Sequence, residues 1–315
     1  MIIIHDFNLG LKHFTISEEM YQKFKRLNFE IIDISSANDY QKLNAEVFFG
    51  NRIKTNDLSN FPNLKYIHLG CVGYDKLDFK FLKSREIILT NSSGIVEKSM
   101  AEMSLAAILS FNKRLNLIHN EETCSREFFD KFYHKLKPIN QLKILVYGYG
   151  LVSKEFIELT KNIFLEIDVV TRNKDNCSYY GKKINLGDEL KLIYNYDYII
   201  NNLPLNEDSN EYFDYSFFSK MNNQAVYLSV GRKETTVLKD LVMMVKKRII
   251  RGAYLDVFDN KEVFEYELYN DLNFILTPHI SGWSNEYWQK QYNLLFDNLK
   301  YFENKRYNKL KNLIV

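Results

Sequence analysis

The chain contains 315 residues, 46% of them hydrophobic, and its formal net charge is +2. This length suits two domains, and the hydrophobic fraction is ample for buried cores, so we exclude a disordered chain. Acidic and basic residues are interspersed, which argues against a nucleic-acid-binding surface. We interpret the most basic stretch, "KRYNKLKN" near the end of the sequence, as a solvated helix end.

The first residues, "MIIIHDF", have no basic segment before their short apolar run. They predict a strand and not a signal peptide. The longest apolar segment elsewhere, "MSLAAILSF", is far too short to span a bilayer. The three cysteines, Cys71, Cys124 and Cys177, show no metal-binding or redox spacing. We therefore expect a cytoplasmic protein with no metal site and no membrane association.

Short apolar runs alternate with helical segments in the first part of the chain. Such alternation predicts parallel βαβ units. A helix is predicted at residues 17–27, and a long helix at about residues 97–118 is followed by a polar stretch that leads to Pro138. The strand candidates are residues 1–7, 29–35, 45–51, 64–70 and 86–92.

A second alternating series begins at Gln141. Helices are predicted at residues 151–163 and at about 286–302. The strand candidates are residues 142–148, 165–173, 196–204, 225–231, 250–258 and 274–280. The two series predict an α/β protein with two doubly wound, parallel-sheet (Rossmann-like) domains and an active site in the cleft between them.

The stretch "ILVYGYGLVSKEF" places Gly148 and Gly150 between a predicted strand and a predicted helix. Glycines at such a turn let a pyrophosphate approach the N–H groups at a helix N-terminus. The pattern is G-x-G-x-x-S, because Ser153 stands where a third glycine is usual, and serine is small enough for close packing of helix on strand. An ordinary strand–helix turn is the alternative. The strand–turn–helix context favours a dinucleotide-binding site.

The next predicted strand ends in "VVTRNK". An acidic residue at this point would bind a ribose 2′-hydroxyl group, and a nearby arginine would bind a 2′-phosphate. Thr171 stands about where the acid would be and Arg172 follows it, whereas Asp168 lies earlier, inside the apolar run. Arg172 as an ordinary surface charge is the alternative. We predict NADP (NADPH) as the cofactor in preference to NAD.

Several motifs together make the chain resemble a known family. In chain order they are "LKYIHLGCVGYDKLD", "TNSSGIVEKSMAEMSLAAIL", "YGYGLV", "NNLPL", "LSVGRKE", "LDVFDN" and "TPHISG". By these motifs the sequence resembles the D-2-hydroxyacid dehydrogenases, the D-isomer-specific family. The resemblance implies a split substrate-binding domain, residues 1–96 and 284–315, around a dinucleotide-binding domain, residues 97–283. It also implies a homodimer.

The resemblance assigns chemistry to individual residues. Arg232, in "SVGR", matches the arginine that binds the substrate carboxylate, a task that suits a guanidinium because it forms a bidentate fork. His279, in "TPHISG", matches the acid–base histidine that gives a proton to the carbonyl oxygen as hydride arrives. Val72 and Gly73 match the loop whose N–H groups meet the substrate carboxylate.

Other matched positions line the cofactor. Asp256 matches the residue that holds the nicotinamide carboxamide. The predicted cofactor-binding set is Gly148, Gly150, Leu151, Val152, Thr171, Arg172, Asn173, Leu203, Pro204, Val230, Asp256, Ser281 and Gly282. Two further substrate contacts have structural alternatives: Arg52 either reaches a second anionic group or is a surface charge, and Trp283 either walls the pocket or packs.

The stretch "DVFDNKEV", residues 256–263, departs from the family pattern D-V-F-x-x-E. In the family that glutamate pairs with the histidine and keeps it protonated. Counting five residues from Asp256 reaches Lys261, and Glu262 is one residue late. The catalytic carboxylate is therefore either missing or supplied by Glu262.

We expect an enzyme that transfers hydride from NADPH to the α-carbon of a small 2-oxo acid, or of its 2-imino analogue, and gives the D-product. One alternative is an imino acid reductase that makes a D-amino acid and receives its imine from a partner amino-acid oxidase. Reduction of a ketone requires a proton for the new alkoxide oxygen, whereas an iminium nitrogen already carries its proton. Another is a non-catalytic dinucleotide-sensing protein that resembles the C-terminal-binding-protein corepressors. The retained Arg232 and His279 favour the enzyme.

Overall fold

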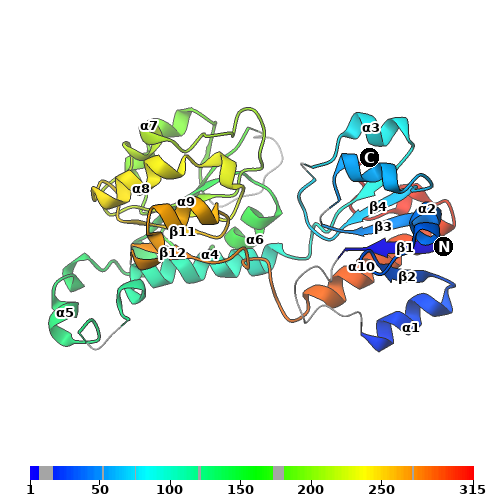
Figure 1. The fold of residues 1–315 in the computed structure, drawn as a ribbon. Coiled ribbons are helices and arrows are strands. Elements are labelled where there is room, and N and C mark those ends of the chain that lie inside the picture. Colours follow the sequence, from blue (N-terminus) through cyan, green and yellow to red (C-terminus); the bar gives the residue numbers. More distant parts are fainter. Residues whose placement is uncertain (7–16, 52, 75, 120–121, 173–180, 272) are drawn as a thin grey trace. The chain divides into compact units, whose positions relative to one another are not determined.

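The computed structural model describes the chain apart from residues 7–16, 52, 75, 120–121, 173–180 and 272. It divides into two compact units, each built on one parallel sheet (Figure 1). Unit 1 comprises Met1–Ile95 and Ser284–Val315, and unit 2 comprises Val96–Trp283. The predicted α/β class with two doubly wound parallel sheets is confirmed. Over the described part of the chain, no helix has both the length and the apolar character needed to cross a membrane.

Unit 1 has a five-stranded parallel sheet in the order β2-β1-β3-β4-β5. Both faces of this sheet are covered, so its strands are nearly continuous apolar runs, and this is why the sequence revealed each of them. The strands are β1 (Ile2–His5), β2 (Glu30–Asp33), β3 (Ala45–Gly50), β4 (Tyr66–Leu69) and β5 (Ile88–Thr90).

Helices pack on both faces of the unit 1 sheet. On one face, α1 (Glu18–Arg26) and α10 (Tyr287–Glu303) bury Phe24 and Leu295 against residues of β1, β3 and β4. Ser17 precedes α1, and its hydroxyl accepts from the N–H of Met20, as expected for an N-cap. The other face packs against α3 (Phe79–Ser84), with α2 (Asp39–Asn44) beside β1.

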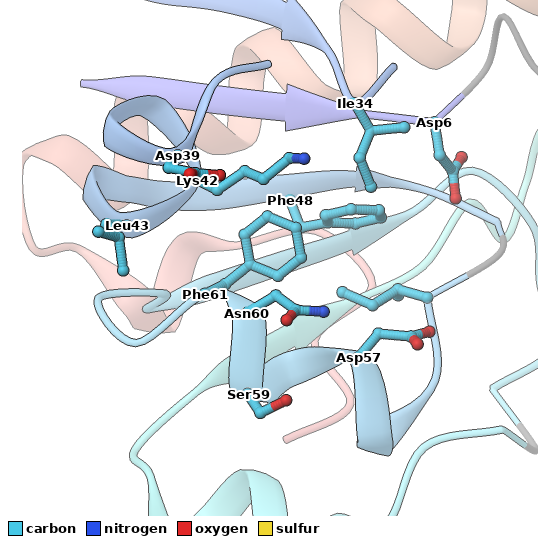
Figure 2. A pocket seen from close by; sticks show the side chains of 11 residues that line it. Asp6, Ile34, Asp39, Lys42, Leu43, Phe48, Asp57, Ser59, Asn60 and Phe61 are labelled. Carbon is cyan, nitrogen blue, oxygen red and sulfur yellow. The ribbon is translucent and has the colours of Figure 1, made fainter. Parts of the chain in front are cut away.

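A hollow of about 740 Å³ lies beside α2 in unit 1 (Figure 2). Phe48 and Phe61 are among its lining residues, and their rings meet edge to face with centroids 5.7 Å apart. Asp39, Lys42 and Asp57 contribute charged side chains to the lining. None of the described residues predicted to form the functional site lines this hollow.

Unit 2 has a seven-stranded parallel sheet in the order β12-β11-β10-β9-β6-β7-β8. The strand order reverses at β6, which lies between β9 and β7. The strands are β6 (Lys143–Tyr147), β7 (Glu166–Val170), β8 (Lys183–Ile184), β9 (Tyr198–Asn201), β10 (Val226–Ser229), β11 (Gly252–Leu255) and β12 (Phe274–Leu276).

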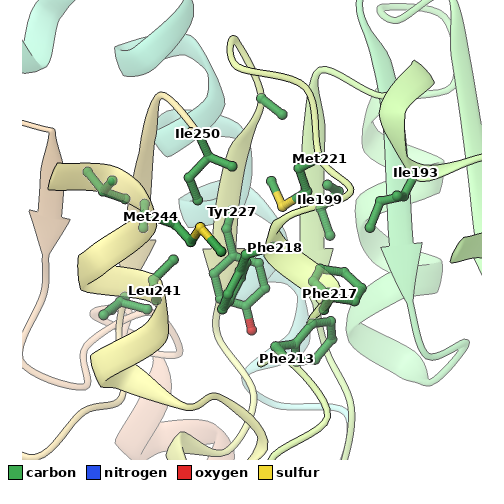
Figure 3. Close-up of a cluster of buried hydrophobic side chains, with 14 of the residues drawn as sticks. Ile193, Ile199, Phe213, Phe217, Phe218, Met221, Tyr227, Leu241, Met244 and Ile250 are labelled. Atoms are coloured by element: carbon green, nitrogen blue, oxygen red, sulfur yellow. The ribbon is translucent and has the colours of Figure 1, made fainter. Parts of the chain in front are cut away.

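Both faces of the unit 2 sheet are also buried. On one face, α4 (Glu97–Asn112) and α6 (Leu151–Thr160) pack on β6, β7, β9 and β10. On the other, α7 (Tyr215–Phe218) and α8 (Leu238–Lys246) contribute an aromatic and aliphatic cluster that includes Phe217, Phe218 and Met244 (Figure 3). The remaining α-helices are α5 (Arg126–Asp130) and α9 (Asn260–Glu265).

The helix α4 is shorter than the predicted helix at 97–118, because it ends at Asn112. Arg114 has a φ of 59°, in the left-handed region, which stops helical propagation. A 3-10 helix, Leu115–Leu117, follows. The apolar pattern therefore extended beyond the true helix end. The two-residue strand β8 was not predicted, since two residues show no periodicity.

Candidate functional site

The predicted dinucleotide residues lie where strands of unit 2 end. Gly148 follows β6 with a φ of +87°, and a Cβ atom there would lie 3.2 Å from the carbonyl oxygen of Asn202. A side chain at this position is therefore both conformationally strained and crowded. Gly150 caps α6, and a Cβ built there has no heavy atom within 4 Å. The turn thus leaves open space in front of the first turn of α6.

The N-terminus of α6 offers unpaired donors. No acceptor among the described residues meets the N–H groups of Leu151, Val152 or Ser153, and Gly150 provides no side-chain cap. Three free N–H groups and the positive end of a ten-residue helix are the features by which a helix N-terminus binds an anion such as a pyrophosphate. The residues at this turn therefore fit a dinucleotide.

The serine of the G-x-G-x-x-S pattern has a defined partner. Ser153 is completely buried, and its hydroxyl accepts from the side-chain amide of Asn202 at 2.9 Å. This bond joins α6 to the segment that follows β9, which contains Leu203 and Pro204. Leu203 donates its N–H to the side-chain oxygen of Asn201 at 3.0 Å. The two predicted cofactor-lining residues are thus anchored by two consecutive asparagines.

The predicted 2′-phosphate site lies at the end of β7. Thr171 donates its N–H to the carbonyl of Ile184 in β8. The guanidinium of Arg172 pairs with Asp208 at 2.7 Å, and both side chains are mostly exposed. Exposed ion pairs contribute little to stability, so this pair can exchange for another anion at small cost. Asn173 lies outside the described residues.

The segment after β10 carries Val230 and Arg232. Val230 is buried, and Gly231 brings the chain so close to Leu203 that an added Cβ atom would lie 2.9 Å from the Leu203 carbonyl. Arg232 is half-buried, and its carbonyl accepts from the hydroxyl of Thr235 at 2.7 Å. The backbone around Arg232 is therefore fixed on both sides.

Asp256 holds the loop that carries His279. Its buried carboxylate accepts from the hydroxyl of Thr277 at 2.6 Å, the N–H of Ile280 at 2.9 Å, and both the N–H and the hydroxyl of Ser281. The N–H of His279 also donates to the Asp256 carbonyl at 2.9 Å. His279 has a φ of 56° and is exposed. The loop presents the imidazole outward in a left-handed conformation that a non-glycine residue adopts only when it is held.

These bonds bear on two predicted cofactor contacts. The predicted role of Asp256 in holding a nicotinamide carboxamide stays a prediction, and the carboxylate already meets donors from three residues. Ser281 directs both its hydroxyl and its N–H to Asp256, so its carbonyl is the polar group left for the cofactor. Gly282 lies close to Val96, and the exposed Trp283 accepts a hydrogen bond at its carbonyl from Ser99.

The three acids of the stretch "DVFDNKEV" lie in different surroundings. Asp256 organises the histidine loop. Asp259 caps α9, pairs with Lys233 at 3.2 Å, and has its pKa lowered first by the Lys261 N–H and then by Lys233. Glu262 is exposed on α9, and among the described residues no hydrogen bond or ion pair joins it to His279. Its predicted catalytic role stays a prediction without a contact to support it.

In unit 1, the predicted carboxylate-binding loop follows β4 and has all its carbonyls engaged. The Gly70 carbonyl accepts from Tyr287 and from Gln291, both at 2.7 Å. The carbonyl of Cys71 accepts from the N–H of Ser92, and that of Val72 accepts from the side chain of Asn91 at 2.8 Å. The Gly73 carbonyl accepts from the thiol of Cys71 at 3.2 Å.

The donors of this loop are, in contrast, unused. Among the described residues, no acceptor meets the N–H groups of Val72 and Gly73, and Val72 is exposed. A backbone whose carbonyls are all fixed by other groups leaves its N–H groups to an external acceptor. This geometry fits the predicted binding of a carboxylate. Arg52, the other predicted substrate contact in unit 1, lies outside the described residues.

The sequence did not reveal Asn91 and Gln291 as parts of the site. Both act on the loop from far along the chain, Gln291 from α10. A buried glutamine at helical spacing from buried apolar residues of α10 was the available signal, since such a side chain requires a partner.

Comparison with known proteins gives the family. The family model described as "D-isomer specific 2-hydroxyacid dehydrogenase, NAD binding domain" matches residues 105–281, more than half of the chain. The chain belongs to the D-isomer specific 2-hydroxyacid dehydrogenase family. As a member of this dehydrogenase family it is an oxidoreductase that uses a nicotinamide dinucleotide, as the sequence predicted.

Relatives within the D-isomer specific 2-hydroxyacid dehydrogenases are distant. A glyoxylate reductase of Thermococcus litoralis is 24% identical over 237 residues, which is 73% of this chain and 71% of that protein. A probable 2-ketogluconate reductase of Dictyostelium discoideum is 25% identical over 272 residues, 82% of this chain and 80% of that protein.

Two solved structures have the same fold. An acyclic imino acid reductase in complex with NADPH and D-arginine superposes with a TM-score of 0.81, at 20% identity, over 100% of both chains. An NADPH-dependent glyoxylate/hydroxypyruvate reductase of Sinorhizobium meliloti, in complex with NADP and malonate, gives 0.77 at 17% identity, over 100% of this chain and 96% of that chain.

Proposed function

We propose that the protein is an NADPH-preferring reductase that transfers hydride to the α-carbon of a small 2-oxo acid, or of the corresponding 2-imino acid, and gives the D-product. The observation that carries this proposal is the loop in which Asp256 holds His279 outward, at the same sheet edge as Arg232 and the open N-terminus of α6. The carboxyl ends of parallel strands are where such folds bind their ligands.

The bound cofactor supplies the hydride, and this chain's residues supply binding, polarisation and a proton. We assign the dinucleotide pyrophosphate to the N–H groups of Leu151 and Val152. Arg232 and the N–H groups of Val72 and Gly73 are proposed to bind the substrate carboxylate. The guanidinium also draws electron density from the adjacent C=O or C=N group. A ring nitrogen of His279 donates the proton that the oxygen or nitrogen requires.

The preference for NADPH rests on the end of β7. Thr171 replaces the acid that would bind a ribose 2′-hydroxyl group, and it adds no negative charge there. Arg172 provides an exposed guanidinium whose present partner, Asp208, is equally exposed. A 2′-phosphate carries more charge than a carboxylate and accepts a bidentate fork, so it competes well for Arg172.

An imino acid is the second candidate substrate, and a specific observation favours it. Among the described residues, no carboxylate is bonded to His279, and Glu262 is exposed on α9. A carboxylate partner would raise the histidine pKa and keep the acid protonated, which a ketone requires because its reduction creates an alkoxide. An iminium carries its own proton and ends as a neutral amine. The fold similarity to an acyclic imino acid reductase accords with this reading.

A comparison of two assays tests the proposal. NADPH oxidation is measured with a panel of 2-oxo acids, and again while an amino-acid oxidase generates the imines in situ. We expect turnover in at least one arm, and a larger kcat/KM in the imine arm if the imino acid is the substrate. Good turnover of oxo acids with no gain from imines would exclude the imino acid reading. Glu262→Gln would then lower kcat by about 100-fold or more, if Glu262 supports His279.

The same assays separate the enzyme from a dinucleotide sensor. NADPH binding with no turnover in either arm would favour a non-catalytic sensing protein. We further propose a homodimer in the cytoplasm. The cytoplasmic location accords with Cys71 and Cys124, neither of which forms a disulfide.

A further inference from the structure

Two arginines near the N-terminal ends of the unit 2 strands lack a counter-ion among the described residues. The first is Arg114, directly after α4, which is 8% exposed. Its Cζ atom lies 5.8 Å from the ring centre of Phe132. In the described part of the chain no hydrogen bond or ion pair reaches its guanidinium, and its Nε atom is buried without a partner. Burying a charged donor without an acceptor is costly.

The second is Arg251, directly before β11. One of its terminal nitrogens donates to the hydroxyl of Tyr198 at 2.7 Å, and its Cζ atom lies 5.4 Å from that ring centre. Its Nε atom is also buried without a partner. The hydroxyl of Tyr198 accepts this bond, and its own proton has no acceptor among the described residues. Two guanidiniums and a hydroxyl therefore offer unused donors.

The local charges do not supply the missing acceptor. Burial, and then the charge of Arg251, lower the pKa of Arg114 to about 10, while Tyr198 acts in the opposite direction. The nearby Asp197 is already engaged, because it pairs with Lys137 and accepts from the N–H of Lys143 at 3.0 Å. An added anion would relieve the repulsion and fill the empty donor positions.

We propose that Arg114, Arg251 and Tyr198 form an oxyanion-binding site at the N-terminal ends of the unit 2 strands, opposite to the dinucleotide site. The occupant is either a free phosphate-like anion or a carboxylate of a second copy of this chain. Guanidinium groups suit both, since a phosphate and a carboxylate each offer two oxygen acceptors to the guanidinium fork. The strands β9 and β11 begin beside this site, so it is separate from the C-terminal strand ends that are assigned to the cofactor.

Thermal unfolding with increasing inorganic phosphate tests the site, with Arg251→Gln as the variant and Arg248→Gln as the control. Arg248 is exposed and only three residues away. If a free anion is the occupant, phosphate raises the Tm of the unmodified protein and of the control, and Arg251→Gln loses the response. Phosphate bound by α6 would stabilise all three proteins alike, so an equal rise in Tm would overturn the hypothesis that a free anion occupies the site.

Sedimentation at several protein concentrations tests whether a carboxylate of a second copy of this chain occupies the site. If a carboxylate of a second copy is the occupant, Arg251→Gln weakens self-association by about tenfold or more, and Arg248→Gln leaves it unchanged. Arg114→Gln should behave like Arg251→Gln in the same two experiments. Should that variant fail to fold, phosphate binding by calorimetry to the unmodified protein and to Arg251→Gln decides. Equal phosphate binding and equal association in all variants would overturn the proposal.

Discussion

Tyr287 and Gln291 of α10 both donate to the Gly70 carbonyl, and we call these two hydrogen bonds the Gly70 clamp. We predict that Gln291, through this clamp, sets the affinity for substrate. Gln291 is completely buried; its amide donates to Gly70 at 2.7 Å, and its oxygen accepts from Ser92 at 2.5 Å. Gln291→Leu keeps a similar volume and removes both bonds. The acceptor and the donor each retain another partner, namely Tyr287 for Gly70 and the Leu69 carbonyl for Ser92.

The structure gives the size of the effect. Two neutral hydrogen bonds at about 0.5–1.5 kcal/mol each imply a loss of about 1–3 kcal/mol in the free energy of unfolding. A loop that loses its alignment forfeits at most about one hydrogen bond to a charged group, about 1.5–3 kcal/mol, which is roughly a 10- to 100-fold rise in KM. The kcat and the KM for NADPH should change little, because the clamp does not touch the reacting atoms.

Initial rates with the best acid from the substrate panel, at saturating NADPH, measure this split. Gln289→Leu is the matched control, since Gln289 lies exposed on the same helix and bonds only to Asn293 among the described residues. Tyr287→Phe removes one hydroxyl from Gly70 and should give a smaller rise in KM. An unchanged KM in Gln291→Leu, with a lowered Tm, would refute the positioning role and leave the glutamine as a packing residue.

Three further predictions concern the cofactor, the substrate anchor and pH. Replacing Thr171 by Asp and Arg172 by Ser should reverse a roughly 10- to 100-fold preference for NADPH, measured as the ratio of kcat/KM values; equal values in the unmodified protein would contradict the assignment. Arg232→Lys should greatly lower kcat/KM for the acid with NADPH affinity nearly unchanged, because lysine lacks the fork; a collapse of cofactor affinity would move Arg232 to the dinucleotide site. Burial lowers the pKa of His68 to about 3, so the folded state holds it neutral. Stability due to His68 is complete above about pH 6.5 and falls as pH drops towards 3, by about 1.4 kcal/mol per unit at most. Urea unfolding should show a shallower acid dependence in His68→Gln, and parallel curves would argue against a buried neutral imidazole.

The sequence predicted the strands well because both sheets are parallel and covered on both faces. Runs such as "ILVY" in β6 are apolar without interruption, and this is what a strand with two buried faces requires. The end of α4 was not predictable, because the left-handed residue there is Arg114, and arginine has no local preference for that conformation.

The candidate site was predictable where the motif and the strand end coincide. Gly148, Arg232 and His279 all follow strands that the sequence revealed. The support for these residues was not predictable, because it comes from contacts between distant segments. Asp256 meets donors more than 20 residues later, and Gln291 reaches Gly70 across 221 residues. Residue spacing in the sequence carries no information about such pairs.

In the sequence, unit 2 is inserted between the two segments of unit 1, and this order has a consequence for biosynthesis. The core of unit 1 needs α10, which buries Leu295 and Leu299 against the sheet, and the closing segment, in which Ile314 donates to the Leu89 carbonyl at 2.8 Å. A ribosome therefore releases the five strands of unit 1 long before the pieces that complete it. Unit 2 is continuous and is available to fold first. During this interval the apolar face of the early sheet lacks its cover, which makes this stage of synthesis the one most exposed to aggregation and to chaperone binding.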